Sequence, residues 1–290
     1  MKQRLLPKND KIFKIIFGRK ENSWIFKEFV HDLIGIEVNE VTYLDPTKIF
    51  SIRHSKEEEV KKKAASKTRI VDILMEINNQ TMLTLEMQVR KTNYFLERIM
   101  LYILDVYGYN YGNKEKMREP NNKYSGLEPA IQICILDYNE FDDDKAIHQF
   151  HLTGEDAVDG VKRLITIVTF ELHKPIINVE DPVSRDNLEA MRSIYIDGVL
   201  DSDAPKYVQA VYKKSNYYNL TKEDQLEVDA IESAIDQREA ELSYAKIEGK
   251  NEGMIEEKFE VAQSLLAQGI DLNIIIKATK LSAEEIEKLK

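Results

Sequence analysis

The chain has 290 residues, enough for one large domain with an extension or for two domains, and 43% of them are hydrophobic, enough for a real core. Its formal net charge of −10 argues against a general nucleic-acid coat protein. The single cysteine, Cys134, excludes an internal disulfide framework. Because no apolar run could span a bilayer and the N-terminus lacks a secretory apolar region, we expect a cytoplasmic protein with no membrane partner.

The charge is distributed unevenly along the chain. Residues 51–125 contain 14 Lys and Arg against 10 Asp and Glu, whereas residues 126–205 contain 6 against 17. Only the first half of the chain therefore offers the phosphates of a nucleic acid a favourable field.

Helical spacing marks the first segment, from Asn9 to about Ile34, where apolar residues recur at threes and fours. Asn9 or Asp10 can cap its start, and Gly18 predicts a break into two helices. The β-branched and aromatic residues at 38–52 then predict one or two strands. Residues 53–67 follow as a charged, weakly ordered connection.

Residues 68–89, with the sequence TRIVDILMEINNQTMLTLEMQV, predict a hairpin of two strands. Alternate residues of a strand share a face, and each strand has one wholly apolar face. These faces consist of Val71, Ile73, Met75 and Ile77 in the first strand and of Leu83, Leu85, Met87 and Val89 in the second.

The register of this hairpin decides where its acids lie. If both apolar faces lie on the core, a loop at Asn78-Asn79-Gln80 pairs Ile73 with Leu85 and places Asp72 opposite Glu86. A slip by two residues would put Asp72 opposite Gln88, and a slip by one would mix the two faces. Two carboxylates and an amide therefore converge in either acceptable register.

Opposed anions destabilise a hairpin unless something compensates their charge. A divalent cation is the simplest compensation, and the hard oxygen ligands suit Mg²⁺ or Mn²⁺. The alternative is that this face of the hairpin is solvated and that its acids have no function. The composition of the hairpin leaves both interpretations open.

The rest of the first half predicts alternating helices and strands. A helix is expected at about Thr92–Tyr111, where no Gly or Pro occurs before Gly108. The apolar run at 129–138 is typical of a strand buried on both faces, which makes Cys134 a structural thiol. Further strand candidates lie at 146–154 and 164–174. His148 and His151 would face opposite sides of a strand, and the acidic run at 142–145 is interpreted as a solvated loop.

From about Val179 to the C-terminus the pattern is helical. A charged helix is expected at 222–268, interrupted by Gly249 and Gly253, and residues 271–290 predict two short helices with a capping box at Ser282 and Glu285. A helix-turn-helix that reads DNA is disfavoured, because its second helix would expose acids that phosphate repels: Glu284, Glu285 and Glu287. Packing or oligomerisation is the preferred role, and we expect a homodimer through the helices after about Lys222.

The order of these elements resembles the PD-(D/E)xK nuclease superfamily, and within it the recombination-promoting nuclease and transposase (Rpn) branch. The resemblance rests on LLPKNDKIFKIIFG near the N-terminus, on IVDILME and LTLEMQ in the hairpin, on the helix after it, on IQICILDY and on FELHKP. It covers residues 1 to about 178, and the helical tail is similar to tails found on many members.

The resemblance implies a restriction-endonuclease-like α/β fold, with a mixed sheet flanked by helices, over residues 1–178. Residues 179–290 would form a helical extension used for oligomerisation. Asp72 and Glu86 would hold Mg²⁺, or Mn²⁺ as a substitute, for phosphodiester hydrolysis, with Gln88 completing the catalytic set. Superfamily members usually have lysine where Gln88 stands, and a neutral amide can only orient water or donate a hydrogen bond.

Four further residues are site candidates. Asp10 is similar to an acid that completes or supports the metal site in such proteins, although it also suits an ordinary helix N-terminus. Lys14 lies one turn later and can approach phosphate. Arg98 and Tyr102 are spaced i, i+4 on one helix face, where they can position a phosphate of DNA or simply stack on each other.

The resemblance therefore implies a Mg²⁺-dependent DNA endonuclease without an organic cofactor. The alternative is a nuclease-fold protein with little or no activity that acts as a nucleic-acid-binding or regulatory module. Gln88, the acidic balance and the long tail motivate this alternative. RNA in place of DNA as the substrate is a third interpretation.

Overall fold

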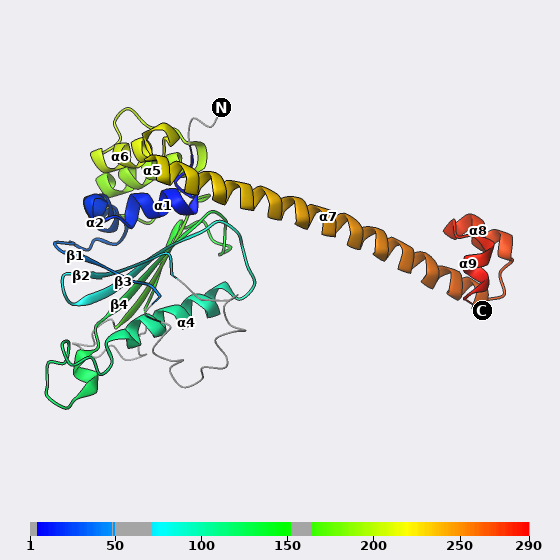
Figure 1. Cartoon of the computed structure of the whole chain (residues 1–290), viewed down its shortest axis with the longest axis horizontal. Helices are drawn as coiled ribbons and strands as arrows, with labels where there is room; N and C mark the ends of the chain where they lie inside the picture. The colour runs from blue at the N-terminus through cyan, green and yellow to red at the C-terminus, as the bar shows by residue number, and fades with distance from the viewer. Residues whose placement is uncertain (1–4, 48, 50–70, 152–163, 290) are drawn as a thin grey trace. The chain divides into compact units, whose positions relative to one another are not determined.

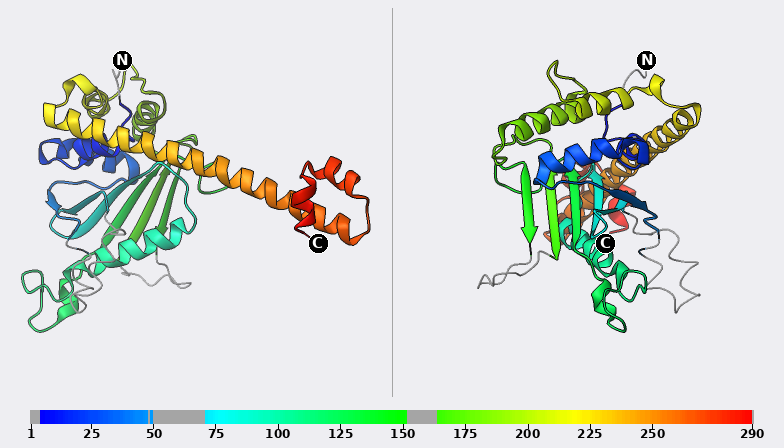
Figure 2. Two further views of the ribbon diagram at one scale, coloured as in Figure 1. Left: turned by 45° about the vertical axis from the view of Figure 1, so that its right-hand side comes forward. Right: turned by 90° about the vertical axis from the view of Figure 1, so that its left-hand side faces the viewer.

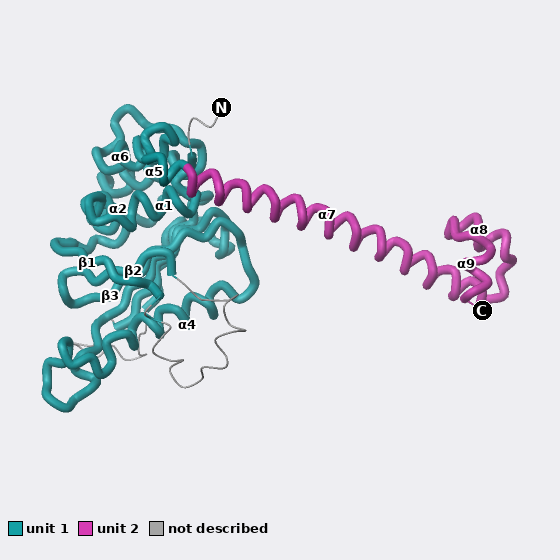
Figure 3. The backbone as a smooth tube through the Cα atoms, in the orientation of Figure 1, with its two compact units in different colours: residues 1–225 teal, residues 226–290 magenta. Residues whose placement is uncertain are grey.

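The computed structural model describes residues 5–47, 49, 71–151 and 164–289. The chain divides into two compact units, Met1–Gln225 and Leu226–Lys290 (Figure 3). The charged connection expected at 53–67 lies outside the described residues, as does most of the strand candidate at 47–52. Within the first unit, the helices after residue 179 belong to the same compact body as the sheet.

The first unit is built on a mixed six-stranded sheet with the strand order β1-β2-β3-β4-β6-β5. Strands β3, β4 and β6 run parallel to one another, whereas the pairs β1–β2, β2–β3 and β5–β6 are antiparallel. The strands span Val41–Leu44 (β1), Ile73–Ile77 (β2), Thr81–Gln88 (β3), Ala130–Leu136 (β4), Ile147–His151 (β5) and Ile165–Glu171 (β6). The strands expected in the second half of this unit are confirmed.

Helices cover the two faces of the sheet. Helices α1 and α2 lie on one face, with α5 and α6 packed behind them, and α4 lies on the opposite face (Figures 1 and 2). These helices span Asp10–Phe17 (α1), Ser23–Ile34 (α2), Phe95–Tyr107 (α4), Pro182–Asp197 (α5) and Lys206–Lys214 (α6). The mixed sheet flanked by helices confirms the expected fold class.

The predicted break in the first segment is confirmed. The side chain of Asn9 accepts hydrogen bonds from the backbone N–H groups of Lys11 and Ile12, which satisfies two of the free donors at the start of α1. Gly18 ends α1, and a Cβ at this position would lie 2.7 Å from the carbonyl oxygen of Lys14. Asn9 and Gly18 thus bound a short helix that packs against α2 and α6.

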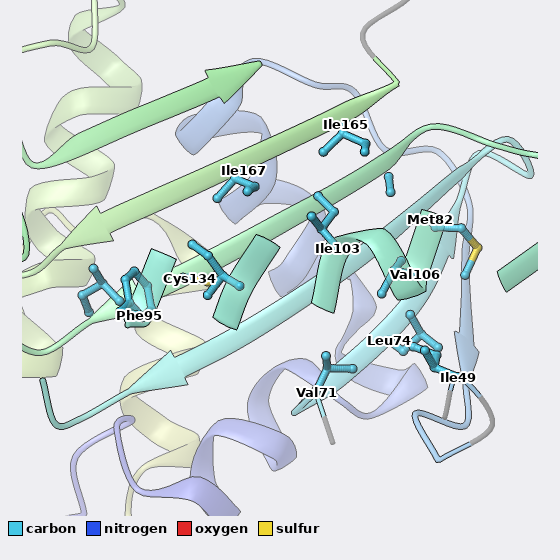
Figure 4. Close-up of a cluster of buried hydrophobic side chains, with 13 residues drawn as sticks. Ile49, Val71, Leu74, Met82, Phe95, Ile103, Val106, Cys134, Ile165 and Ile167 are labelled. Carbon is cyan, nitrogen blue, oxygen red and sulfur yellow. The ribbon is translucent and has the colours of Figure 1, made fainter. Parts of the chain in front are cut away.

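Helix α4 buries its apolar side on the sheet. Phe95, Ile103 and Val106 project from α4 towards Leu74 and Cys134 of the strands beneath it (Figure 4). The helix begins at Phe95 rather than near Thr92, because Tyr94 adopts a left-handed backbone conformation with φ of 61°. Cys134 is fully buried, as expected for a structural thiol.

The second unit is helical. Helix α7 spans Lys222–Ala267, and the short helices α8 (Leu272–Thr279) and α9 (Ala283–Glu287) follow it. The predicted interruption at Gly249 and Gly253 is wrong, because a glycine costs a helix only about 1 kcal/mol and a long helix tolerates two. The predicted capping box of Ser282 and Glu285 is confirmed. Among the described residues, no helix combines the length and apolar character needed to cross a bilayer.

Candidate active site

The hairpin of β2 and β3 has the predicted register. Ile73 pairs with Leu85 and Met75 with Leu83, and the turn lies at residues 78–80. Asn78 and Asn79 both have positive φ, which asparagine tolerates better than most residues. Just before β2, a carboxylate oxygen of Asp72 accepts a hydrogen bond from the backbone N–H of Met87 at 3.0 Å.

Asp72 therefore lies beside Glu86 at the end of the hairpin. Its side chain is 22% exposed, so this carboxylate is the part of the pair that solvent reaches. Burial raises the pKa of Asp72, while the Met87 amide and the charge of Lys14 act in the opposite direction. Asp72 is thus a solvent-reachable carboxylate whose negative charge is only partly balanced by the Met87 amide and by Lys14.

Glu86 lies deeper and is only 2% exposed. One of its oxygens accepts a hydrogen bond from the side-chain amide of Gln132 at 3.0 Å, and the other from that of Gln88 at 3.2 Å. Burial, followed by the charge of Asp72, raises the pKa of Glu86 to about 8. The protein therefore does not fully compensate the negative charge of this carboxylate by itself.

Gln88 connects Glu86 to a cation on the next helix. Its side-chain oxygen accepts a hydrogen bond from the guanidinium of Arg98 at 2.7 Å, while its N–H group donates to Glu86. The amide thus lies between a cation and an anion and uses both of its polar ends. Arg98, on α4, contributes a positive charge that lowers the pKa of Glu86.

The other candidates have separate surroundings. Lys14 forms an ion pair with Asp10 one turn earlier at 2.8 Å, and its ammonium lies 4.0 Å from a carboxylate oxygen of Asp72. Asp10 is held by Lys14, and its negative charge reaches Asp72 electrostatically. Tyr102, also on α4, packs against the buried cluster beneath that helix. Lys14 is thus the candidate cation beside Asp72.

The interpretation of this face of the hairpin as solvated is wrong. Thr84 is fully buried and Glu86 nearly so, because helix α4 covers the face on which they lie. Alternation of polar and apolar residues usually marks a strand with one solvated face. In β3 the polar side instead forms a buried site.

Two features of the surroundings were not predicted. Gln132, in the buried strand β4, contacts Glu86 directly. Among the described residues, one cluster brings together three atoms that could bind a metal ion. They belong to Asp143, His148 and Glu171 and lie within 4.8 Å of one another. Lys174 pairs with Glu171 and lies 3.4 Å from Asp143, so a cation already balances these acids. The acidic run at 142–145 is therefore linked to β5 and β6 rather than wholly solvated.

The donor set at Asp72 and Glu86 fits a divalent cation. In proteins Mg²⁺ is usually bound by one or two carboxylates together with water and the phosphate oxygens of a substrate. Two carboxylates with raised pKa values, one of them reachable from solvent, match this description. Amide donors hold the deeper carboxylate, as commonly found around the ligands of metal sites.

A model of the PD-(D/E)XK nuclease family transposases matches residues 7–190, more than half of the chain. The chain belongs to this family. The match spans the sheet, the helices α1, α2 and α4, and the first part of α5. No curated protein and no solved structure matches the chain significantly. Membership in this family identifies the chain as a nuclease-type protein and agrees with the resemblance drawn from the sequence.

A second model, of the C-terminal helix-turn-helix domain of the Rpn/YhgA-like nuclease family, matches residues 256–290. These residues include the end of α7 together with α8 and α9, which bury a small core of Ala262, Ile275, Leu281 and Ile286. The C-terminal residues of the chain thus match a helix-turn-helix domain. In the sequence, the acids of the second helix, Glu284, Glu285 and Glu287, had argued against a helix-turn-helix that reads DNA.

The lysine usual in the superfamily should not suit position 88 of this chain. In Gln88→Lys, the guanidinium of Arg98 would lose its acceptor and face a second cation. We expect the free energy of unfolding to fall by about 1–3 kcal/mol and cleavage to decrease rather than increase. Urea unfolding and a plasmid-nicking assay measure the two effects. Higher activity at unchanged stability would show that the Gln88–Arg98 contact is dispensable.

Proposed function

We propose that this protein is a Mg²⁺-dependent endonuclease that hydrolyses phosphodiester bonds of DNA, of the recombination-promoting type. The observation that carries the proposal is the pair of interacting carboxylates, Asp72 and Glu86, whose negative charge the protein itself compensates only in part. Membership in the PD-(D/E)XK nuclease family supports the same reaction class. The helix-turn-helix match supports DNA as the partner.

Asp72 and Glu86 would hold the metal ion. A Mg²⁺ ion bound there would supply Lewis-acid polarisation of a phosphoryl oxygen and would orient a water molecule. Arg98 keeps Gln88 in place, and Gln88 in turn fixes one oxygen of Glu86. Lys14 offers a positive charge beside Asp72, where it can attract a phosphate. Asp10 keeps the Lys14 ammonium in position through their ion pair.

The test of this proposal is a cleavage assay with purified full-length protein. Supercoiled plasmid should be nicked or cut in Mg²⁺ or Mn²⁺ and should stay intact in EDTA. A single-stranded RNA and a single-stranded DNA of equal length would establish the preferred sugar. Absence of cleavage on every substrate in both metals would contradict the proposal.

One observation favours a second candidate function, a nuclease-fold module that binds but cleaves little. Glu86 is 2% exposed and both of its oxygens already accept hydrogen bonds. Calorimetry with Mn²⁺ separates the two candidates. Binding in the micromolar to millimolar range supports the enzyme, and no heat of binding at millimolar metal supports the module.

We expect the full-length protein to be a homodimer through helix α7. Ile247, Met254 and Val261 are exposed and spaced seven residues apart, which is the repeat of a coiled coil. Light scattering should give about twice the chain mass of 33.7 kDa. Met254→Glu should shift the protein to monomer, whereas Gln263→Glu, which adds the same charge outside this repeat, should not. A monomeric wild type would defeat the expectation.

A further inference from the structure

Gln132 is a fully buried glutamine in the middle of β4. Its neighbours along the strand, Ile131 and Ile133, are apolar, and every residue of β4 is buried. An amide placed in such a strand must leave water, which is unfavourable unless hydrogen bonds replace those that it loses. The position therefore calls for an explanation other than packing.

The hydrogen bonds of Gln132 are used on one side only. Its N–H group donates to Glu86 at 3.0 Å, whereas its side-chain oxygen is buried without a hydrogen-bond partner. An apolar residue of similar shape would avoid this unsatisfied oxygen. The amide also contacts the thiol of Cys134, which is only a weak hydrogen-bond partner. The contact with the Glu86 carboxylate is therefore the one that explains an amide at this position.

The register shows how Gln132 reaches Glu86. Gln132 lies opposite Thr84 and Glu86 lies opposite Cys134, so the contact runs diagonally between the parallel strands β3 and β4. Gln88 donates to the other oxygen of Glu86 from its own strand. The two amides thus hold the carboxylate between them, and loss of either would leave one buried oxygen without a donor.

We propose that Gln132 is a positioning residue that orients the Glu86 carboxylate for a divalent cation. The proposal rests on the proposed function, because it needs a metal ion at Asp72 and Glu86. Gln132 itself stays behind Glu86 and acts through it. Groups that orient the ligands of a metal ion in this way typically change metal affinity or activity by about 10–100-fold when they are replaced.

Gln132→Met tests the proposal, because methionine keeps the approximate length and volume of glutamine and removes the donor together with the unsatisfied oxygen. We expect calorimetry to show Mn²⁺ affinity about 10–100-fold weaker than in the wild type. The midpoint of urea unfolding without metal should be unchanged or higher, since the unsatisfied oxygen is gone. A purely structural role would lower the unfolding midpoint and leave metal affinity in the folded protein unchanged.

Thr84→Val is the matched control. Thr84 is also fully buried, lies directly opposite Gln132 and has a hydroxyl without a hydrogen-bond partner. It should bind Mn²⁺ as the wild type does. If Gln132→Met does not fold, Gln132→Leu serves with the same expectation.

The outcomes separate this proposal from the proposed function. If the wild type binds Mn²⁺ and Gln132→Met binds it with the same affinity, Gln132 has no positioning role and the proposed function still stands. A wild type that binds no Mn²⁺ would overturn both. Weaker binding in Gln132→Met alone, with Thr84→Val unchanged, supports the positioning role.

Discussion

Replacement of Asp72 by asparagine is expected to abolish DNA cleavage while the fold persists. Asparagine keeps the side-chain oxygen that accepts the hydrogen bond of the Met87 amide, so the end of the hairpin should stay paired. It removes the negative charge that a divalent cation needs. We expect the cleavage rate to fall by at least about a hundred-fold, the scale of losing one group that acts electrostatically at the transition state.

Plasmid nicking measured over a range of Mg²⁺ concentrations checks this prediction, with circular dichroism and urea unfolding to verify the fold. Glu97→Gln is the matched control, because Glu97 is an exposed acid on α4, next to Arg98 in sequence. It removes the same unit of charge and should cleave as the wild type does. Metal-dependent cleavage by Asp72→Asn at the wild-type rate would place the site elsewhere.

The register of the site was predictable because side chains alternate with a period of two along a strand. Matching the apolar faces of β2 and β3 brings Asp72 opposite Glu86, or opposite Gln88 after a slip by two residues, and the structure has the first of these registers. The same reasoning could not tell how deep the acids lie. Depth depends on how helix α4 folds back over the polar face of β3, which the pattern within the hairpin does not show.

Gln132 was recognisable in the sequence as an unusual polar residue, although it was not predicted as a site residue. It is the one amide in the apolar run of residues 130–136, and a lone polar residue in a strand buried on both faces must find a partner. Its partner could not be named, because the pairing of β4 with β3 joins segments separated by helix α4. Long-range pairing of this kind leaves no local pattern.

Glu86→Gln is expected to remove the contribution of Glu86 to the pH dependence of stability of the metal-free protein. The pKa of Glu86 is raised to about 8 in the folded protein, whereas that of an unfolded glutamate is about 4.5. Between these values the folded state keeps a proton that the unfolded state has lost. The contribution of Glu86 to the stability of the protein is therefore largest below about pH 4.5 and is lost as the pH rises towards 8.

The size of the effect follows from the shift. Linkage over this window gives a loss on the order of 4 kcal/mol for Glu86 between pH 5 and pH 8. Glutamine cannot ionise. Its oxygen can accept from Gln88, and its N–H group can donate to Gln132 once the Gln132 amide turns to present its unpaired oxygen, so the variant should be the more stable protein at pH 8. Urea unfolding of both proteins at the two pH values, in EDTA, measures the difference.

Addition of metal should reverse this order in a way that only a metal ligand can produce. A bound divalent cation requires the ionised carboxylate, so its affinity for the wild type should rise with pH, and Mn²⁺ should stabilise the wild type more at pH 8 than at pH 6. Glu86→Gln should gain little at either pH. Equal stabilisation of both proteins by Mn²⁺ would mean that the raised pKa of Glu86 reflects burial in the core and not readiness for a cation.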